Sequence, residues 1–167
     1  MKFIADSMLG RLARWLRLLG YDTLYYPRIE DTLLIRIALK EDRILLTKDT
    51  HLVRRRYMRK YAEYNTRAEA NKTRITYFLL NENNPFEQLK VVISALNLKD
   101  FSLMSRCAVC NAIIAGIPKE NVKDLVPEYV YQTSGTFKQC QGCKKLYWEG
   151  THPEKFRKKL SEILGTA

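Results

Sequence analysis

Three aspartates are placed where they could bind a metal ion together. Asp6 follows the apolar run Phe3–Ala5, and Asp49 lies two residues beyond the apolar run Ile44–Thr47. Asp31 stands at the start of an expected helix. If the two runs are strands of one parallel sheet, the loops at their carboxyl ends form the ligand crevice, where the carboxylates can converge. Oxygen-only ligands suit Mg²⁺ or Mn²⁺, which support phosphodiester hydrolysis. The pattern therefore predicts Asp6, Asp31 and Asp49 as catalytic residues.

Each aspartate, taken singly, also has a structural explanation. Asp31 can cap a helix, Asp6 can end a strand, and Asp49 can form a turn. The metal-site interpretation rests on the combination, because Asp6 and Asp49 interrupt apolar strands at equivalent ends. Thr47 would place a hydroxyl group in the same crevice.

Two groups of arginines flank these acids. One lies at intervals of three residues on the expected helix after Asp6, which predicts a stripe facing away from the leucines; the other follows Asp49. Cations around an acidic centre suit a nucleic-acid backbone, since they bind the flanking phosphates. A solvated charged face is the alternative. We predict RNA-binding roles for six residues: Arg11, Arg14, Arg17, Arg54, Arg55 and Arg56.

The four cysteines form two Cys-x-x-Cys pairs, Cys107/Cys110 and Cys140/Cys143, with 29 residues between the pairs. This spacing predicts a tetrahedral zinc site with four thiolate ligands and no vacant position, and therefore a structural role. Two redox-active pairs are the alternative. In a reducing compartment the spacing favours a metal over disulfides.

The charge of the whole chain points to a polyanionic partner. The 167 residues include 29 Lys and Arg against 18 Asp and Glu, giving a net charge of +11. Hydrophobic residues make up 46%, which is ordinary for a folded soluble protein and excludes wholesale disorder. No apolar run is long enough to span a membrane, and Asp6 interrupts any signal-peptide pattern, so we expect a cytoplasmic protein.

Short apolar strands alternate with amphipathic helices in the first hundred residues. Strands are expected near 3–5, 24–26, 44–47 and 75–80, with helices between them. The first of these helices is expected to end at Gly20, and a further helix is expected to start at Asn84 and Pro85. A basic helix is expected over 51–61, while 62–74 fits either a helix or a loop. Strands joined by helical crossovers predict an α/β fold with a mostly parallel sheet covered on both faces.

The character of the chain changes near Arg106. Beyond it we expect β-prone pieces at 129–133, 136–139 and 144–148, and a closing helix over 153–164. These features predict two domains, an α/β domain over 1–105 and a zinc ribbon with a C-terminal helix over 106–167. Both halves are basic, so one polyanion could span them.

Four stretches of the chain together resemble a known family: Asp6–Asp22, Leu45–Asp49, Arg106–Asn111 and Tyr147–His152. They look like the RNase domain first described at the C-terminus of the Mut-seven exonuclease, a PIN-like nuclease domain fused to a zinc ribbon. The resemblance covers nearly the whole chain in the right order. It implies a PIN-type fold, metal-dependent cleavage of RNA, and acidic site residues at Asp6 and Asp49.

The chain departs from the wider PIN pattern, which usually has a glutamate on a central helix and a fourth acid after a later strand. Asp31 is our choice for the first position, and Glu82, Asn81 and Asn83 stand near the second. We therefore expect a ribonuclease that uses Mg²⁺ or Mn²⁺ and carries structural zinc. The alternatives are a non-catalytic RNA-binding factor, with the ribosome or a tRNA as partner, and a toxin-like PIN protein regulated by a partner.

Overall fold

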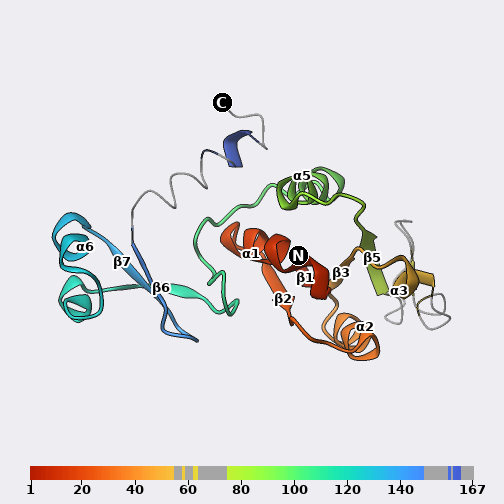
Figure 1. The fold of residues 1–167 in the computed structure, drawn as a ribbon, viewed down its shortest axis with the longest axis horizontal. Helices are drawn as coiled ribbons and strands as arrows, with labels where there is room; N and C mark the ends of the chain where they lie inside the picture. The colour runs from red at the N-terminus through yellow and green to blue at the C-terminus, as the bar shows by residue number, and fades with distance from the viewer. Residues whose placement is uncertain (55–57, 59–61, 64–74, 149–157, 159, 163–167) are drawn as a thin grey trace.

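The structure is a computed structural model that describes residues 1–54, 58, 62–63, 75–148, 158 and 160–162 (Figure 1). In the first part of the chain, strands alternate with helices in the order β1 (Lys2–Ala5), η1 (Ser7–Leu9), α1 (Gly10–Leu18), β2 (Asp22–Tyr25), α2 (Asp31–Lys40), β3 (Ile44–Thr47), α3 (Thr50–Arg54), β4 (Ala62–Glu63), β5 (Ile75–Leu79) and α5 (Pro85–Ala95). The second part contains β6 (Ile114–Ile117), η2 (Lys119–Val122), α6 (Glu128–Thr133), β7 (Phe137–Cys140) and β8 (Leu146–Trp148).

The first part forms one parallel sheet with the strand order β2-β1-β3-β5-β4. Parallel neighbours need long crossovers, and α1 and α2 provide those from β1 to β2 and from β2 to β3. The predicted α/β fold is confirmed. The carboxyl ends of β1, β3 and β5 lie side by side at one edge of the sheet, which we call the carboxyl edge.

Two hydrophobic cores cover the two faces of the sheet because side chains alternate along each strand. Phe3, Ala5 and Leu46 pack with α1 and α5 in the first core, whereas Ile4 and Leu45 pack with α2 in the second. In Figure 1, α1 and α2 accordingly lie on opposite sides of the strands.

Helix α1 ends at a glycine, as the sequence predicts. Gly20 has a φ of 100°, and the N–H groups of Gly20 and Tyr21 donate to the carbonyls of Arg17 and Leu16. This pattern is a Schellman motif. A Cβ at Gly20 would lie 2.7 Å from the carbonyl oxygen of Ser102, so the segment after α5 packs directly against the end of α1.

The second part forms an antiparallel sheet with the order β6-β7-β8. The prediction of a β-prone piece at 129–133 is wrong, because those residues belong to α6. Local bonds stabilise this helix: the Tyr131 N–H donates to the carbonyl of Pro127, and the Thr133 hydroxyl donates to that of Tyr129. Tertiary packing contributes little here, since none of the residues of α6 is buried.

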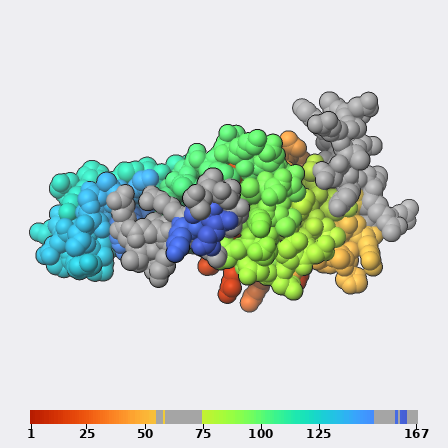
Figure 2. Space-filling view, turned by 90° about the horizontal axis from the view of Figure 1, so that it is seen from above, coloured from red at the N-terminus to blue at the C-terminus, as the bar shows by residue number. Residues whose placement is uncertain are grey.

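The described residues near the C-terminus pack against the first part of the molecule. Leu160 is buried in the core formed by α1 and α5, and in Figure 2 the dark blue residues lie against the green surface. Most of the predicted closing helix, the basic helix beyond Arg54 and most of 62–74 lie outside the described residues. Among the helices that are described, none has the length and apolarity needed to cross a membrane.

Candidate functional site

Asp6 ends β1 and is held at the carboxyl edge by contacts from two directions. Only 5% of the residue is exposed. Its Oδ1 accepts a hydrogen bond from the Met8 N–H at 2.8 Å, which caps the following turn. Its Oδ2 accepts from the Thr47 hydroxyl and, at 2.8 Å, from the Lys48 N–H. The carboxylate is therefore fixed by the neighbouring strand as well as by its own turn.

Asp49 is joined to Asp6 through the Thr47 hydroxyl, which donates to Asp6 and accepts from the Asp49 N–H at 2.9 Å. The Oδ1 of Asp49 accepts from the N–H groups of His51 at 2.7 Å and Leu52 at 3.2 Å, so this oxygen caps α3. Its Oδ2 has no hydrogen-bond partner among the described residues. One carboxylate oxygen thus fixes the side chain, and the other remains available.

Asp31 is the first residue of α2, in the connection that leaves the carboxyl end of β2. It does not cap the helix, because Glu30 occupies the cap position. Within the described part of the chain, Asp6, Asp31 and Asp49 are not a group of three with ligand atoms within 4.8 Å of one another. The sheet topology brings the three acids to one edge, and Thr47 directly connects only two of them.

Lys48 and Asn83 add a cation and an amide to the carboxyl edge, and a contact between these two residues was not predicted from the sequence. Lys48 follows β3, and its Nζ donates to Asn83 Oδ1 at 2.5 Å. Asn83 follows β5, the next strand of the sheet. The sequence signal that could have predicted this contact is that the two residues follow two strands that are adjacent in the sheet.

Two of the three arginines of α1 face solvent, as the predicted stripe requires. Arg11 and Arg14 are exposed, but Arg17 is only 4% exposed. The Arg17 guanidinium donates to the carbonyls of Thr23, Ala108 and Val109. The prediction that Arg17 binds RNA is therefore wrong, because the side chain is buried and its Nε and Nη1 donate to carbonyls inside the protein. Of the second group, Arg54 is exposed, and Arg55 and Arg56 lie outside the described residues.

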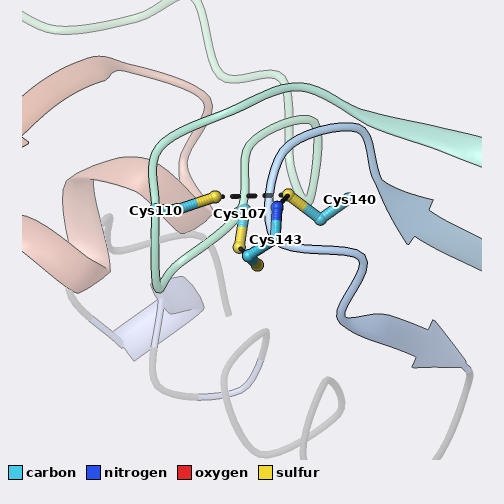
Figure 3. Close-up of side chains that lie close together, drawn as sticks. All are labelled: Cys107, Cys110, Cys140 and Cys143. Carbon is cyan, nitrogen blue, oxygen red and sulfur yellow. Dashed lines mark hydrogen bonds between the residues drawn. The ribbon is translucent and has the colours of Figure 1, made fainter.

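The four cysteines converge from two loops, and Figure 3 shows their sulfur atoms meeting between those loops. All four sulfurs lie within 4.8 Å of one another, with 3.6 Å between Cys107 and Cys143 and 3.3 Å between Cys110 and Cys140. A tetrahedral zinc ion bound to four thiolates separates its sulfurs by roughly 3.8 Å. The cluster therefore fits zinc, and it leaves no ligand position for a substrate.

The surroundings of the first pair favour thiolates. Burial opposes ionisation of Cys110, but hydrogen bonds from the backbone N–H of Ala112 and from Cys140 outweigh it and lower its pKa to about 6. Burial likewise opposes ionisation of Cys107, while the Tyr147 hydroxyl, 3.0 Å away, helps to lower the pKa of this thiol. Metal binding needs this ionised form.

A polar network joins the first Cys-x-x-Cys turn to the amino end of β2. The carboxylate of Asp22 lies 2.8 Å from Arg43 and accepts from the Asn111 amide at 2.8 Å, and Arg106 lies 3.8 Å away. Burial raises the pKa of Asp22, but the hydrogen bonds from Arg43 and Asn111 outweigh it, so the net shift is downward. Asp22 is thus a structural carboxylate, and it lies at the amino end of its strand, away from the carboxyl edge.

We expect Asp22→Asn to lower the free energy of unfolding at pH 7 by about 2 kcal/mol, because it removes a charge that binds two hydrogen-bond donors. The depressed pKa means that the stabilisation is complete above the unfolded pKa of about 3.9 and is lost as the pH falls through the folded pKa. Urea unfolding at pH 7 and pH 3 measures both effects. The exposed Asp42→Asn is the control, and equal loss in the two variants at pH 7 would contradict this role for Asp22.

Of three comparisons with known proteins, one found a match. A search of curated proteins and a search of solved structures each found no match. The family model described as "Mut7-C RNAse domain" matches residues 1–160, which include both the carboxyl edge and the cysteine cluster. This chain belongs to the Mut7-C RNAse domain family.

Proposed function

We propose that the chain is a ribonuclease that hydrolyses RNA phosphodiester bonds with Mg²⁺ or Mn²⁺ held at the carboxyl edge. The observation that supports this most is the fixation of Asp6. A strand terminator or cap needs only the bond from Met8, whereas Asp6 also accepts from Thr47 and Lys48 on the adjacent strand. Such cross-strand bonding holds a ligand group in one position before the ion arrives.

The proposed ligands are Asp6 and Asp49, with Asp31 as a third acid near the same edge. Mg²⁺ is commonly bound by one or two carboxylates, waters and substrate phosphate, so Asp6 and Asp49 would be sufficient. Thr47 links the Asp6 carboxylate to the backbone N–H of Asp49. A bound divalent ion polarises the phosphate and lowers the pKa of a water molecule. Lys48, held by Asn83, is placed to counter phosphate charge beside these acids.

RNA as substrate is supported by the family and by charge. The family is that of an RNase domain, and the net charge of +11 favours a polyanion. We propose that zinc at the cysteine cluster is structural, that residues 1–105 and 106–167 are two domains, and that the protein works in the cytoplasm, where unpaired thiols persist.

The second candidate is a non-catalytic RNA-binding factor that docks on a tRNA or the ribosome. The specific observation behind it is the thin acidic set: the described residues contain no three-carboxylate cluster, and the loop after β5 presents Asn81 and Asn83 around Glu82. This candidate predicts tight binding without cleavage.

One assay separates the two candidates. A pool of random-sequence RNA and a structured RNA are incubated with the zinc-loaded protein in Mn²⁺, in Mg²⁺ or without a divalent ion, and both binding and cleavage are measured. The ribonuclease proposal predicts cleavage only with the divalent ion. Saturating binding with intact RNA under every condition would instead identify the docking factor.

The exposed arginines of α1 are expected to bind the RNA backbone. Replacing Arg11 and Arg14 by Gln should weaken RNA binding at low salt for all sequences alike, and should reduce the slope of log K against log salt by about 1 to 2. The matched control is Arg36→Gln, an exposed arginine on α2 across the sheet. Binding titrations at several salt concentrations test this; equal slopes in all three proteins would show that the α1 arginines are a solvated surface.

A further inference from the structure

Arg17 makes an unusual connection between parts of the chain about ninety residues apart. Its Nε donates to the carbonyl of Thr23 at 2.8 Å, and its Nη1 donates to those of Ala108 at 3.1 Å and Val109 at 2.8 Å. Ala108 and Val109 are the two residues between Cys107 and Cys110. The guanidinium therefore holds the backbone of the turn that presents half of the cysteine cluster.

The residue after this turn makes a second connection to the same place. Asn111 has a left-handed φ of 70°, and its N–H closes the turn by donating to the carbonyl of Cys107. Its side-chain oxygen accepts from the Thr23 N–H at 3.0 Å, and its amide donates to Asp22 at 2.8 Å. Among the described strands β2 lies at the edge of the sheet, so the Asn111 side chain takes the place of a neighbouring strand as partner of the buried Thr23 N–H.

Electrostatics also favours the position of the Arg17 guanidinium beside the cysteine cluster. A zinc ion with four thiolates carries a net charge of −2, and a buried anion needs a nearby cation. Burial of the guanidinium lowers the pKa of Arg17, and the thiolates of Cys107 and Cys110 oppose this effect. Arginine also offers the rigid fork needed to bind several carbonyls together, which lysine lacks.

From these contacts we infer that Arg17 is a positioning residue of the cysteine metal site: the guanidinium at the end of α1 fixes the Cys107–Cys110 turn and faces the charge of the metal-loaded cluster. Metal binding and the order of the α1–β2 junction are then coupled, and thermodynamic linkage makes this coupling reciprocal. The inference does not depend on RNA cleavage. Arg17 would position metal ligands, whereas Arg11 and Arg14 are expected to bind RNA.

The test compares zinc affinity in the full chain by competition with a chromophoric chelator. Arg17→Met should weaken zinc binding by about 10- to 100-fold, the usual effect of removing a group that orients metal ligands. Arg14→Met is the matched control, since it removes the same charge from an exposed position on the same helix, and it should bind zinc like wild type. Arg17→Lys should remain weakened, because it keeps the charge without the fork. Equal zinc affinity in Arg17→Met and Arg14→Met would overturn the inference.

A measurement on the unmodified protein covers the case in which Arg17→Met does not fold. Amide hydrogen exchange is followed with zinc bound and after chelation. Zinc removal should accelerate exchange of the Thr23 N–H, which Asn111 binds, while the amides of the central strand β3 keep their protection. Unchanged protection of Thr23 after complete zinc removal would show that the two regions are not coupled and would overturn the inference as well.

Discussion

Asp6→Asn is expected to remove RNA cleavage almost completely while leaving the protein folded. The substitution keeps the volume of the side chain and deletes an anionic ligand. We expect a loss larger than the roughly 100-fold typical of groups that only orient metal ligands. Both oxygens of Asp6 accept hydrogen bonds, and the NH₂ group of asparagine cannot accept one at either position, so we also expect a stability loss of about 1 to 3 kcal/mol. Single-turnover cleavage and thermal unfolding measure the two effects.

Asp42→Asn is the control for this experiment. Asp42 is exposed in the turn before β3, at the opposite edge of the sheet, and its φ of 51° is one that asparagine adopts readily. It should cleave like wild type. If the Asp6→Asn variant is folded and cleaves RNA at the wild-type rate, Asp6 is not part of the catalytic site.

Cys107→Ser is expected to abolish tight zinc binding and to unfold the ribbon. Binding energy at a structural zinc site is folding energy, on the order of 10 kcal/mol or more. The core of the ribbon is small: Cys107, Ile114 and Cys140 are the buried members of its hydrophobic cluster. Outside this cluster, Val122 and Phe137 are the other buried hydrophobic residues of the described ribbon. Without metal, we expect these few side chains to be insufficient to hold β6, β7 and β8 together.

The first part of the chain should remain folded in Cys107→Ser but become less stable. Its first core includes Leu160 from the C-terminal segment, but neither core includes a residue of the ribbon strands. The first part would lose the contacts of Arg17 with the Cys-x-x-Cys turn and those of Asp22 and Thr23 with Asn111, which follows that turn. Zinc content by metal analysis, and amide exchange in β1 and β7, test this. Complete unfolding of β1 together with β7 would show that the chain folds as one unit and that the proposed division at 105/106 is wrong.

The parallel sheet could be predicted from the sequence because the patterns that determine it are local. Apolar runs with helical crossovers determine a parallel sheet, and a parallel sheet brings the ends of β1 and β3 together, so Asp6 and Asp49 could be paired from the sequence alone. The same local signals predicted Gly20 at the end of α1 and Asn84 at the start of α5, whose Oδ1 accepts from the Phe86 N–H.

Features that depend on contacts between distant segments could not be predicted in this way. Helical spacing placed Arg17 with Arg14, and its position four residues after the buried Ala13 was the only local sign that it faces inward. The turn that binds it lies about ninety residues away. The β-branched and aromatic content of 129–133 suggested a strand, but these residues pair with no strand in the described part of the chain, and local helical bonds form instead.

Mn²⁺ binding without RNA shows whether Asp6 and Asp49 form a cation site at the carboxyl edge, and the result does not depend on choosing the right substrate. Water-proton relaxation of zinc-loaded protein is titrated with Mn²⁺ for wild type, Asp6→Asn, Asp49→Asn and Asp42→Asn. We predict one Mn²⁺ site in wild type and Asp42→Asn that is weakened at least about tenfold in both carboxyl-edge variants. Equal Mn²⁺ binding by all four proteins would show that Asp6 and Asp49 do not bind the cation.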